Sequence, residues 1–252
     1  MIFTKQRMAA ILFTALLMTP MISFAQTSPT FEVATIKRSD PAKRSRGFNL
    51  SANRFSIRNQ DVQTLLSVAY SIHPKQIVNA PDWFSTERFD INGVADTDKN
   101  LTVTDAQGMI RAMLTERFGI TLKHEKRELP VYALTVGKDG PKLAVSKSDP
   151  NSLPNQNMNG KGSLVCTNTS MTMFLLGMQS EMDRPLLDQT ALTGKYDFTL
   201  RWTPDTTAAT GDADAPPGIF TAIQEQLGLK LLPVKAAVDA IVIEASTRPT
   251  EN

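Results

Sequence analysis

The sequence predicts an α+β protein made of two similar strand–helix–strand–helix–hairpin units, with mainly antiparallel sheet covered by helices. The first observation is that short β-branched segments alternate along the chain with segments of helical periodicity. The second is that a single gapless shift lays Gly218–Ala245 on Met109–Val136. A fixed offset of this kind predicts that one supersecondary unit is used twice. Five pairs are identical across the shift: Ile110 and Ile219, Glu116 and Glu225, Gly119 and Gly228, Leu122 and Leu231, and Lys126 and Lys235.

The first unit is predicted from its helix boundaries and strand patterns. Asp61 is placed to cap a helix over residues 62–72, which ends before Pro74 because the residue preceding proline avoids the helical region. A capping box at residues 104–107 predicts a second helix that runs to about Phe118, and Gly119 supplies its C-terminal turn. The predicted strands are residues 31–37, 54–58 and 87–94, followed by an antiparallel hairpin of residues 120–127 and 129–137.

The second unit repeats this plan after residues 146–163, a segment rich in Ser, Asn, Pro and Gly that is predicted to be a linker. Ser170 is placed to cap a helix over 171–181, and the last helix, over about 219–227, leads into a final hairpin. Residues 203–218 are predicted to be a flexible insertion. The expected organisation is a first half over 26–145 and a second half over 164–252, as two domains or one compact pseudo-symmetric domain.

Residues 1–25 have the pattern of a secretory signal peptide. Lys5 and Arg7 precede an apolar run from Met8 to Leu17, and Ser23-Phe24-Ala25 offers small residues at the cleavage positions. No Cys follows the site, so a lipid anchor is not expected there. The pattern predicts cleavage before Gln26, a secreted or periplasmic protein, and no membrane span after cleavage.

The charge balance indicates no general attraction to nucleic acid. The chain has 252 residues, with 27 Lys and Arg against 25 Asp and Glu, a formal charge of +2. Residues 1–25 contain two of these bases and no acid, so the cleaved chain would hold 25 of each. A chain near neutrality lacks the electrostatic footprint of a nucleic-acid-binding protein.

No residue is assigned a catalytic, cofactor-binding or metal-ligating role, and no cofactor is expected. The chain has two histidines, and neither His-x-x-x-His nor Cys-x-x-Cys is present. His73 is expected to cap a helix C-terminus, where imidazole meets unpaired carbonyls, and His124 to be structural or exposed. The single cysteine, Cys166, cannot form an internal disulfide and is interpreted as a small buried thiol.

A candidate interaction surface follows the first predicted helix, at His73, Asp82, Trp83 and Phe84. Two adjacent aromatic residues cannot both point into one core along an extended chain, so one of them is free to meet a ligand or partner. Tryptophan is favoured at recognition sites because it combines a large area with a polar group. The alternative is that Trp83 or Phe84 folds back under the helix as core packing.

Four segments make the sequence similar to the soil-associated protein family: PDWFSTERFDI, ERFGITLKHEKRELPVYALTV, LTGKYDFTLRW and IFTAIQEQLGLKLLPVKAAVDAIVIE. The resemblance covers the chain from Phe31 to the C-terminal tail. It implies a secreted domain of unknown function, multi-copy in some soil bacteria and joined in some members to membrane peptidase modules similar to antibiotic-sensing receptors. It implies no activity and no catalytic residues. Two shorter segments, RFSIRNQDVQTLLSVAY and FTAIQEQLGLKLLP, are similar to the short modules of secretins and TonB-dependent receptors.

Three classes of function follow. The favoured one is a non-catalytic extracytoplasmic binding or interaction module whose partner is an unknown ligand or envelope protein. The second is an envelope assembly or docking domain like the secretin-type modules. The third is an enzyme acting on an envelope or soil polymer.

Overall fold

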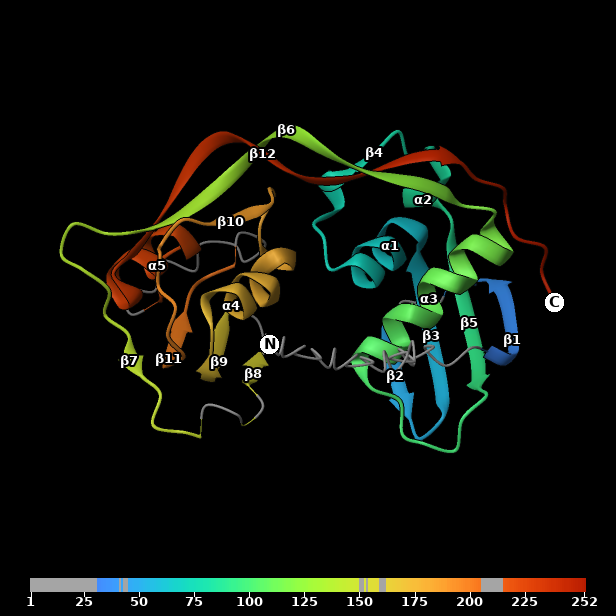
Figure 1. Ribbon diagram of the computed structural model, residues 1–252, viewed down its shortest axis with the longest axis horizontal. Coiled ribbons are helices and arrows are strands. Elements are labelled where there is room, and N and C mark those ends of the chain that lie inside the picture. Colours follow the sequence, from blue (N-terminus) through green and yellow to red (C-terminus); the bar gives the residue numbers. More distant parts are fainter. Residues whose placement is uncertain are drawn as a thin grey trace, which may run out of the picture.

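The computed structural model describes residues 31–40, 42, 45–149, 152, 154–158, 162–204 and 215–252 (Figure 1). The predicted signal peptide and residues 205–214 of the predicted insertion lie outside these described residues. In the described part of the chain there are five α-helices and three four-stranded sheets, mostly antiparallel. The predicted α+β class is therefore confirmed.

The first half is an antiparallel sheet with helices packed on it. The sheet has the order β1-β5-β3-β2. Its core contains Phe55 and Ile57 of the sheet together with Leu65, Leu66 and Phe118 of the helices. The elements are β1 (Phe31–Arg38), β2 (Gly47–Ser51), β3 (Arg54–Asp61), α1 (Val62–Tyr70), η1 (Pro74–Gln76), α2 (Trp83–Thr86), β5 (Arg88–Ala95) and α3 (Val103–Phe118).

The second half has a sheet of order β7-β11-β9-β8 and a core of its own. Part of the segment 146–163, expected to be a linker, is instead the strand β8, which pairs with β9. Its polar composition suits an edge strand, because only one side of such a strand is paired. The elements are β7 (Ala144–Val145), β8 (Asn155–Met158), β9 (Ser163–Thr169), α4 (Met171–Met178), η2 (Gln179–Glu181), β11 (Tyr196–Arg201) and α5 (Ile219–Leu227).

The two halves are joined by a long two-stranded ribbon, β6 (Thr121–Val136) and β12 (Leu229–Ala245), which spans both of them (Figure 1). The strands are antiparallel along their whole length, from the pair Leu229 and Val136 to the pair Ala245 and Thr121. Two short parallel strands flank them, giving the order β10-β6-β12-β4. These are β4 (Ile77–Val78), beside β12, and β10 (Leu186–Asp188), beside β6.

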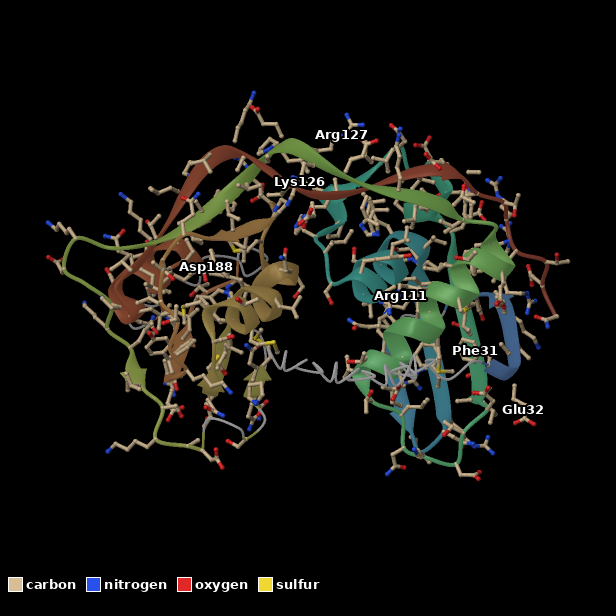
Figure 2. The ribbon with its side chains drawn as sticks, viewed as in Figure 1. Phe31, Glu32, Arg111, Lys126, Arg127 and Asp188 are labelled. Atoms are coloured by element: carbon tan, nitrogen blue, oxygen red, sulfur yellow. The ribbon has the colours of Figure 1, made fainter. Side chains whose placement is uncertain are left out.

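The predicted hairpin of residues 120–127 and 129–137 is wrong, because β6 is continuous and its partner is β12. The predicted final hairpin is likewise the single strand β12. The polar run around Glu128 resembles a turn in sequence, but in this part of the ribbon the residues are exposed or half-exposed. Lys126 and Arg127 lie there on the ribbon between the halves (Figure 2). A strand segment with neither face buried can carry polar residues without forming a turn.

Each end of the ribbon completes one core. Ile241 and Ile243 of β12 belong to the first core, whereas Leu134 of β6 and Leu231 of β12 belong to the second. Burial of these side chains gives the ribbon its stability, at roughly 1.5–3 kcal/mol for each fully buried aliphatic residue. The halves therefore share two strands rather than being joined by a free linker.

Local signals place most helix ends. Asp61 caps α1 by accepting the Thr64 N–H at 2.8 Å, and Gly119 ends α3 with φ +55°, as predicted. The start of α3 differs from the prediction: Thr102 is its cap, and Thr102 and Asp105 accept each other's backbone N–H groups. This is still a capping box, two residues earlier than expected.

Candidate functional site

His73 lies at the junction of the two halves, where it opens the turn η1. Its side chain is only 4% exposed. The Nδ1 atom accepts the Lys75 backbone N–H at 3.1 Å, so Nε2 carries the proton and donates it to the Met182 carbonyl at 3.1 Å. Met182 belongs to the second half, so this hydrogen bond joins the halves.

The expected role of His73 as a C-terminal cap of the preceding helix is wrong. The helix α1 ends at Tyr70 with Ser71, which has a left-handed backbone, as its C-cap, and His73 is the N-cap of η1. Burial lowers the pKa of His73 below its ordinary value of 6.5, outweighing the opposing contribution of the Met182 carbonyl. The imidazole is therefore a neutral structural donor.

Trp83 and Phe84, at 8% and 1% exposure, both belong to the first core. They lie on the short helix α2, where successive side chains turn by about 100°, so both reach the same core without an extended chain. Their rings meet edge to face at 4.6 Å, and Trp83 stacks on Phe118 at 6.5 Å. Of the four candidate surface residues, only Asp82 is exposed. The structure therefore does not bring His73, Asp82, Trp83 and Phe84 together on one open surface.

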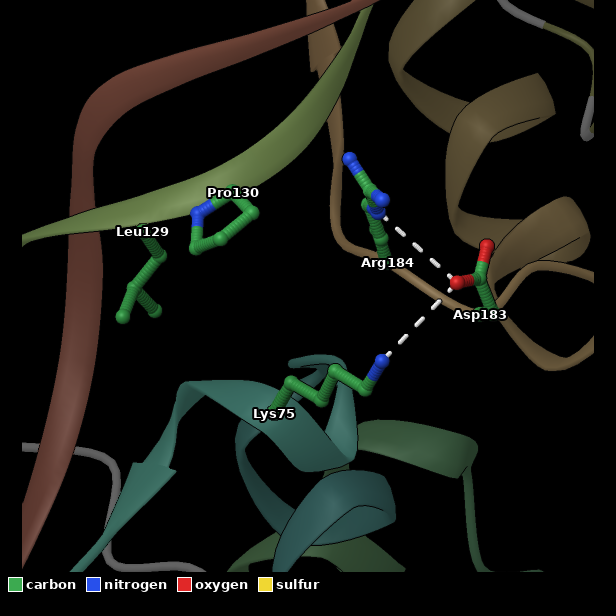
Figure 3. A pocket seen from close by; sticks show the side chains of 5 residues that line it. All are labelled: Lys75, Leu129, Pro130, Asp183 and Arg184. Atoms are coloured by element: carbon green, nitrogen blue, oxygen red, sulfur yellow. Dashed lines mark ion pairs between the residues drawn. The ribbon is translucent and has the colours of Figure 1, made fainter.

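A cleft lies instead at the junction, beneath the ribbon (Figure 3). Its volume is about 390 Å³, within the range of small-molecule sites. Lys75 reaches it from the first half, and Asp183 and Arg184 from the second. Leu129 and Pro130 of β6 form the opposite wall.

The polar side of the cleft is a group of interacting charges. Asp183 Oδ2 lies 3.9 Å from Lys75 Nζ and 3.7 Å from Arg184 Nε. Tyr132 donates its hydroxyl proton to Asp183 Oδ1 at 2.9 Å, and the Arg184 guanidinium lies over the Tyr132 ring at 5.1 Å. Burial and the neighbouring Asp183 carboxylate raise the pKa of Tyr132, so its phenol remains a donor at neutral pH.

None of these four polar residues was named from the sequence. A signal was nevertheless present: the gapless shift that aligns the two C-terminal segments also aligns Lys75 with Arg184. Both precede a short parallel strand, η1 leading to β4 and the Met182 turn to β10. Because Lys75 and Arg184 occupy corresponding positions in the two halves, their side chains are predicted to approach one polar site where the halves meet.

The remaining reactive side chains lie elsewhere. Cys166 is buried in β9, and burial raises the pKa of its thiol to about 11, which leaves it protonated and unreactive. His124 lies on the exposed ribbon with its ring 5.7 Å from Tyr70. Within the described ranges, no cluster of three or more His, Cys, Asp or Glu residues could hold a metal ion. None of the helices described is long and apolar enough to span a bilayer.

The chain belongs to the DUF3738 family of proteins of unknown function, whose model matches residues 63–245. The matched segment runs from α1 to the end of β12, so it includes the junction, the ribbon and the cleft. No curated protein and no solved structure matches the chain.

Proposed function

We propose that this DUF3738 protein is an exported, non-catalytic binding module whose ligand occupies the cleft beneath the ribbon. The observation that carries the proposal is the cleft itself, which gathers two cations and a carboxylate from both halves against an apolar wall. The Tyr132 hydroxyl supports the carboxylate by a hydrogen bond. Ligand sites favour such junctions between structural units, with a few polar groups set against apolar surface. The junction is also held by His73, which limits how far the walls can move apart.

Binding at the cleft is testable by nuclear magnetic resonance on the full chain, with a mixed library of fragment-sized acids, amides and amines. We expect the bound fragments to shift the amide signals of Lys75, Leu129 and Arg184. Pro130→Trp fills the cleft from an exposed position and should abolish this binding while the unfolding temperature stays near that of the wild type. Fragments that bind elsewhere, or that bind Pro130→Trp equally well, would refute the site.

The non-catalytic part of the proposal has a separate test. The purified protein is incubated with a panel of envelope glycans and peptides, and the products are followed by mass spectrometry. We expect no turnover. Hydrolysis that is lost in Pro130→Trp would make the protein an enzyme.

Export is proposed from the signal-peptide pattern of residues 1–25, together with the resemblance of four segments of the chain to the secreted soil-associated protein family. Mass spectrometry of the protein recovered outside the cytoplasm should give an N-terminus at Gln26. Soluble cytoplasmic protein that keeps Met1 would contradict export.

We further propose that the two halves are copies of one duplicated unit. The sheets β1-β5-β3-β2 and β7-β11-β9-β8 support this, because equivalent strands have the same neighbours. The ribbon supports it more sharply. Ile77 of β4 pairs with Ile241 of β12. The shift that relates the C-terminal segments takes Ile77 to Leu186 and, in reverse, Ile241 to Tyr132, and these two residues pair as well.

A local irregularity supports the same proposal. Asn59 and Asn168, which the same shift relates, have φ values of 51° and 52°. Each donates its backbone N–H to an aspartate of the neighbouring strand, Asp90 at 2.7 Å and Asp197 at 2.8 Å. A crystal structure in which residues 54–137 and 163–246 superpose element on element would support duplication, and different strand paths would contradict it.

A further inference from the structure

We propose that the cleft is selective for a small organic monocarboxylate, held at its carboxylate by Lys75 and Arg184 and at its apolar body by Leu129 and Pro130. This inference rests on the proposed function and adds the chemical class of the ligand. Its basis is the balance of charge and apolar surface in the cleft (Figure 3).

The first step is the charge of the cleft. Two cations converge on one carboxylate, that of Asp183, so the lining residues carry one excess positive charge. A monoanion neutralises this excess. A ligand amine would instead meet two like charges, which disfavours its binding.

The second step is how loosely the two cations hold Asp183 Oδ2, since Oδ1 accepts the Tyr132 hydroxyl proton at 2.9 Å on its own. Its ion pairs are 3.9 and 3.7 Å long, whereas Lys123 and Glu125 on the ribbon approach to 2.7 Å. The Asp183 side chain is 64% exposed, and exposed pairs of this kind contribute little free energy. An incoming carboxylate therefore replaces Asp183 Oδ2 between the cations at little cost, while Asp183 remains solvated and keeps the Tyr132 hydrogen bond at Oδ1.

The third step is the orientation of Arg184. Its guanidinium lies over the Tyr132 ring, which restricts where the group can move, and Nε is the atom nearest Asp183. Arginine offers five donors in a fixed fork that matches a carboxylate in two-point contact. The two terminal amino groups have no acceptor among the described residues, so the fork is open to a ligand.

The fourth step is the opposite wall. Leu129 and Pro130 face the charged group across the cleft (Figure 3). Proline has no N–H, so this part of the wall is methylene surface. A ligand with a carboxylate at one end and a few apolar carbons at the other contacts both walls.

The test uses two pairs of probes that differ only in charge: hexanoate with hexanamide, and benzoate with benzamide. Binding to the full chain is measured by nuclear magnetic resonance titration of the Lys75, Leu129 and Arg184 amides. We expect the acids to bind at least about tenfold more tightly than the amides, as befits a charge-assisted contact. Arg184→Gln and Lys75→Met should each remove most of this preference.

Arg127→Gln is the matched control, because Arg127 is an exposed ribbon cation that pairs with Glu125 and does not line the cleft. It should leave the acid preference unchanged. Equal binding of acids and amides would overturn the inference and leave the proposed function standing. The same holds if library fragments bind in the cleft while hexanoate and benzoate do not. If no fragment of any charge binds in the cleft, the proposed function itself fails.

Discussion

The turn at His73 and the turn at Met182 are related by the same sequence shift and face each other across the junction, but they are built differently. His73 is a buried polar residue held by Gln76, whose side chain accepts the His73 N–H at 2.9 Å and donates to the Asp239 carbonyl at 2.6 Å. Met182 is a buried apolar residue that offers only its carbonyl. The His73 turn is fixed by a network of hydrogen bonds, whereas the Met182 turn is fixed by apolar packing. The two sides of the junction are therefore stabilised by different interactions.

The two cores also differ in composition. The first core contains a cluster of rings on Trp83, Phe84, Phe89 and Phe118, two of which stand on α2. The second core buries three methionines, Met171, Met178 and Met182, beside the rings of Phe174, Tyr196 and Trp202, and no helix in its described residues corresponds to α2. Rings specify one packing more strictly than flexible thioether chains do. Truncation of a ring in the first core therefore removes contacts between rings as well as buried area.

The largest expected effect is that of Trp83→Ala. Removal of a buried aromatic side chain leaves a cavity, and we expect the free energy of unfolding to fall by about 3–5 kcal/mol. Urea denaturation measures this change. Phe220→Ala is the control, because Phe220 is 42% exposed and should cost much less. Near-wild-type stability of Trp83→Ala would place Trp83 outside the core and return it to the list of surface candidates.

The next effect compares Asp90 with Asp197. Asp90→Ala leaves the buried N–H of Asn59 without its acceptor, and we expect a loss of about 1–3 kcal/mol. Asp197→Ala should also lower the urea midpoint, because it removes the acceptor of Asn168. A lower urea midpoint in only one of the two variants would show that the irregularities at Asn59 and Asn168 are not structurally equivalent.

Asp197 adds a dependence on acid. The Asn168 N–H lowers the pKa of Asp197 below its ordinary 3.8, so its contribution is complete above pH 3.8 and is lost as pH falls below that value. Comparison of wild type with Asp197→Ala between pH 5 and pH 2 measures the loss. A difference between them that stays constant over this range would refute the assignment.

A smaller effect is expected from His73. Because its pKa is lowered in the folded state, the unfolded chain binds the proton first, and stability falls as pH drops below 6.5. Lys75 and Asp183 are the charged groups that face it, and both are unchanged in His73→Gln. That variant should lack this part of the pH dependence in urea denaturation between pH 7 and pH 5. Equal pH slopes in the two proteins would contradict a neutral buried His73.

The smallest expected effect is that of Lys75→Met on stability. Lys75 and Asp183 are both more than half exposed and 3.9 Å apart, so the free energy of unfolding should change by no more than about 1 kcal/mol. Differential scanning calorimetry gives the value. A large loss would show that the cleft is held together by this ion pair, contrary to a loosely held Asp183.

The sequence alone determined the α+β class, several strands and most helix ends, because these depend on local chemistry. The caps at Asp61 and Ser170 and the glycine turns at Gly119 and Gly228 need only a few neighbouring residues. Burial of Cys166 also followed from its place in a strand.

Only the tertiary structure decided the pairing of β6 with β12, the burial of Trp83 and Phe84, and the cleft. Strand alternation specifies that a strand exists but not its partner, so a long strand with a polar middle was split into a hairpin. The helix α2 turned two adjacent rings toward one core, which an extended chain forbids. The cleft residues come from three separate segments of the chain, and their distances are set by how the halves meet at the ribbon.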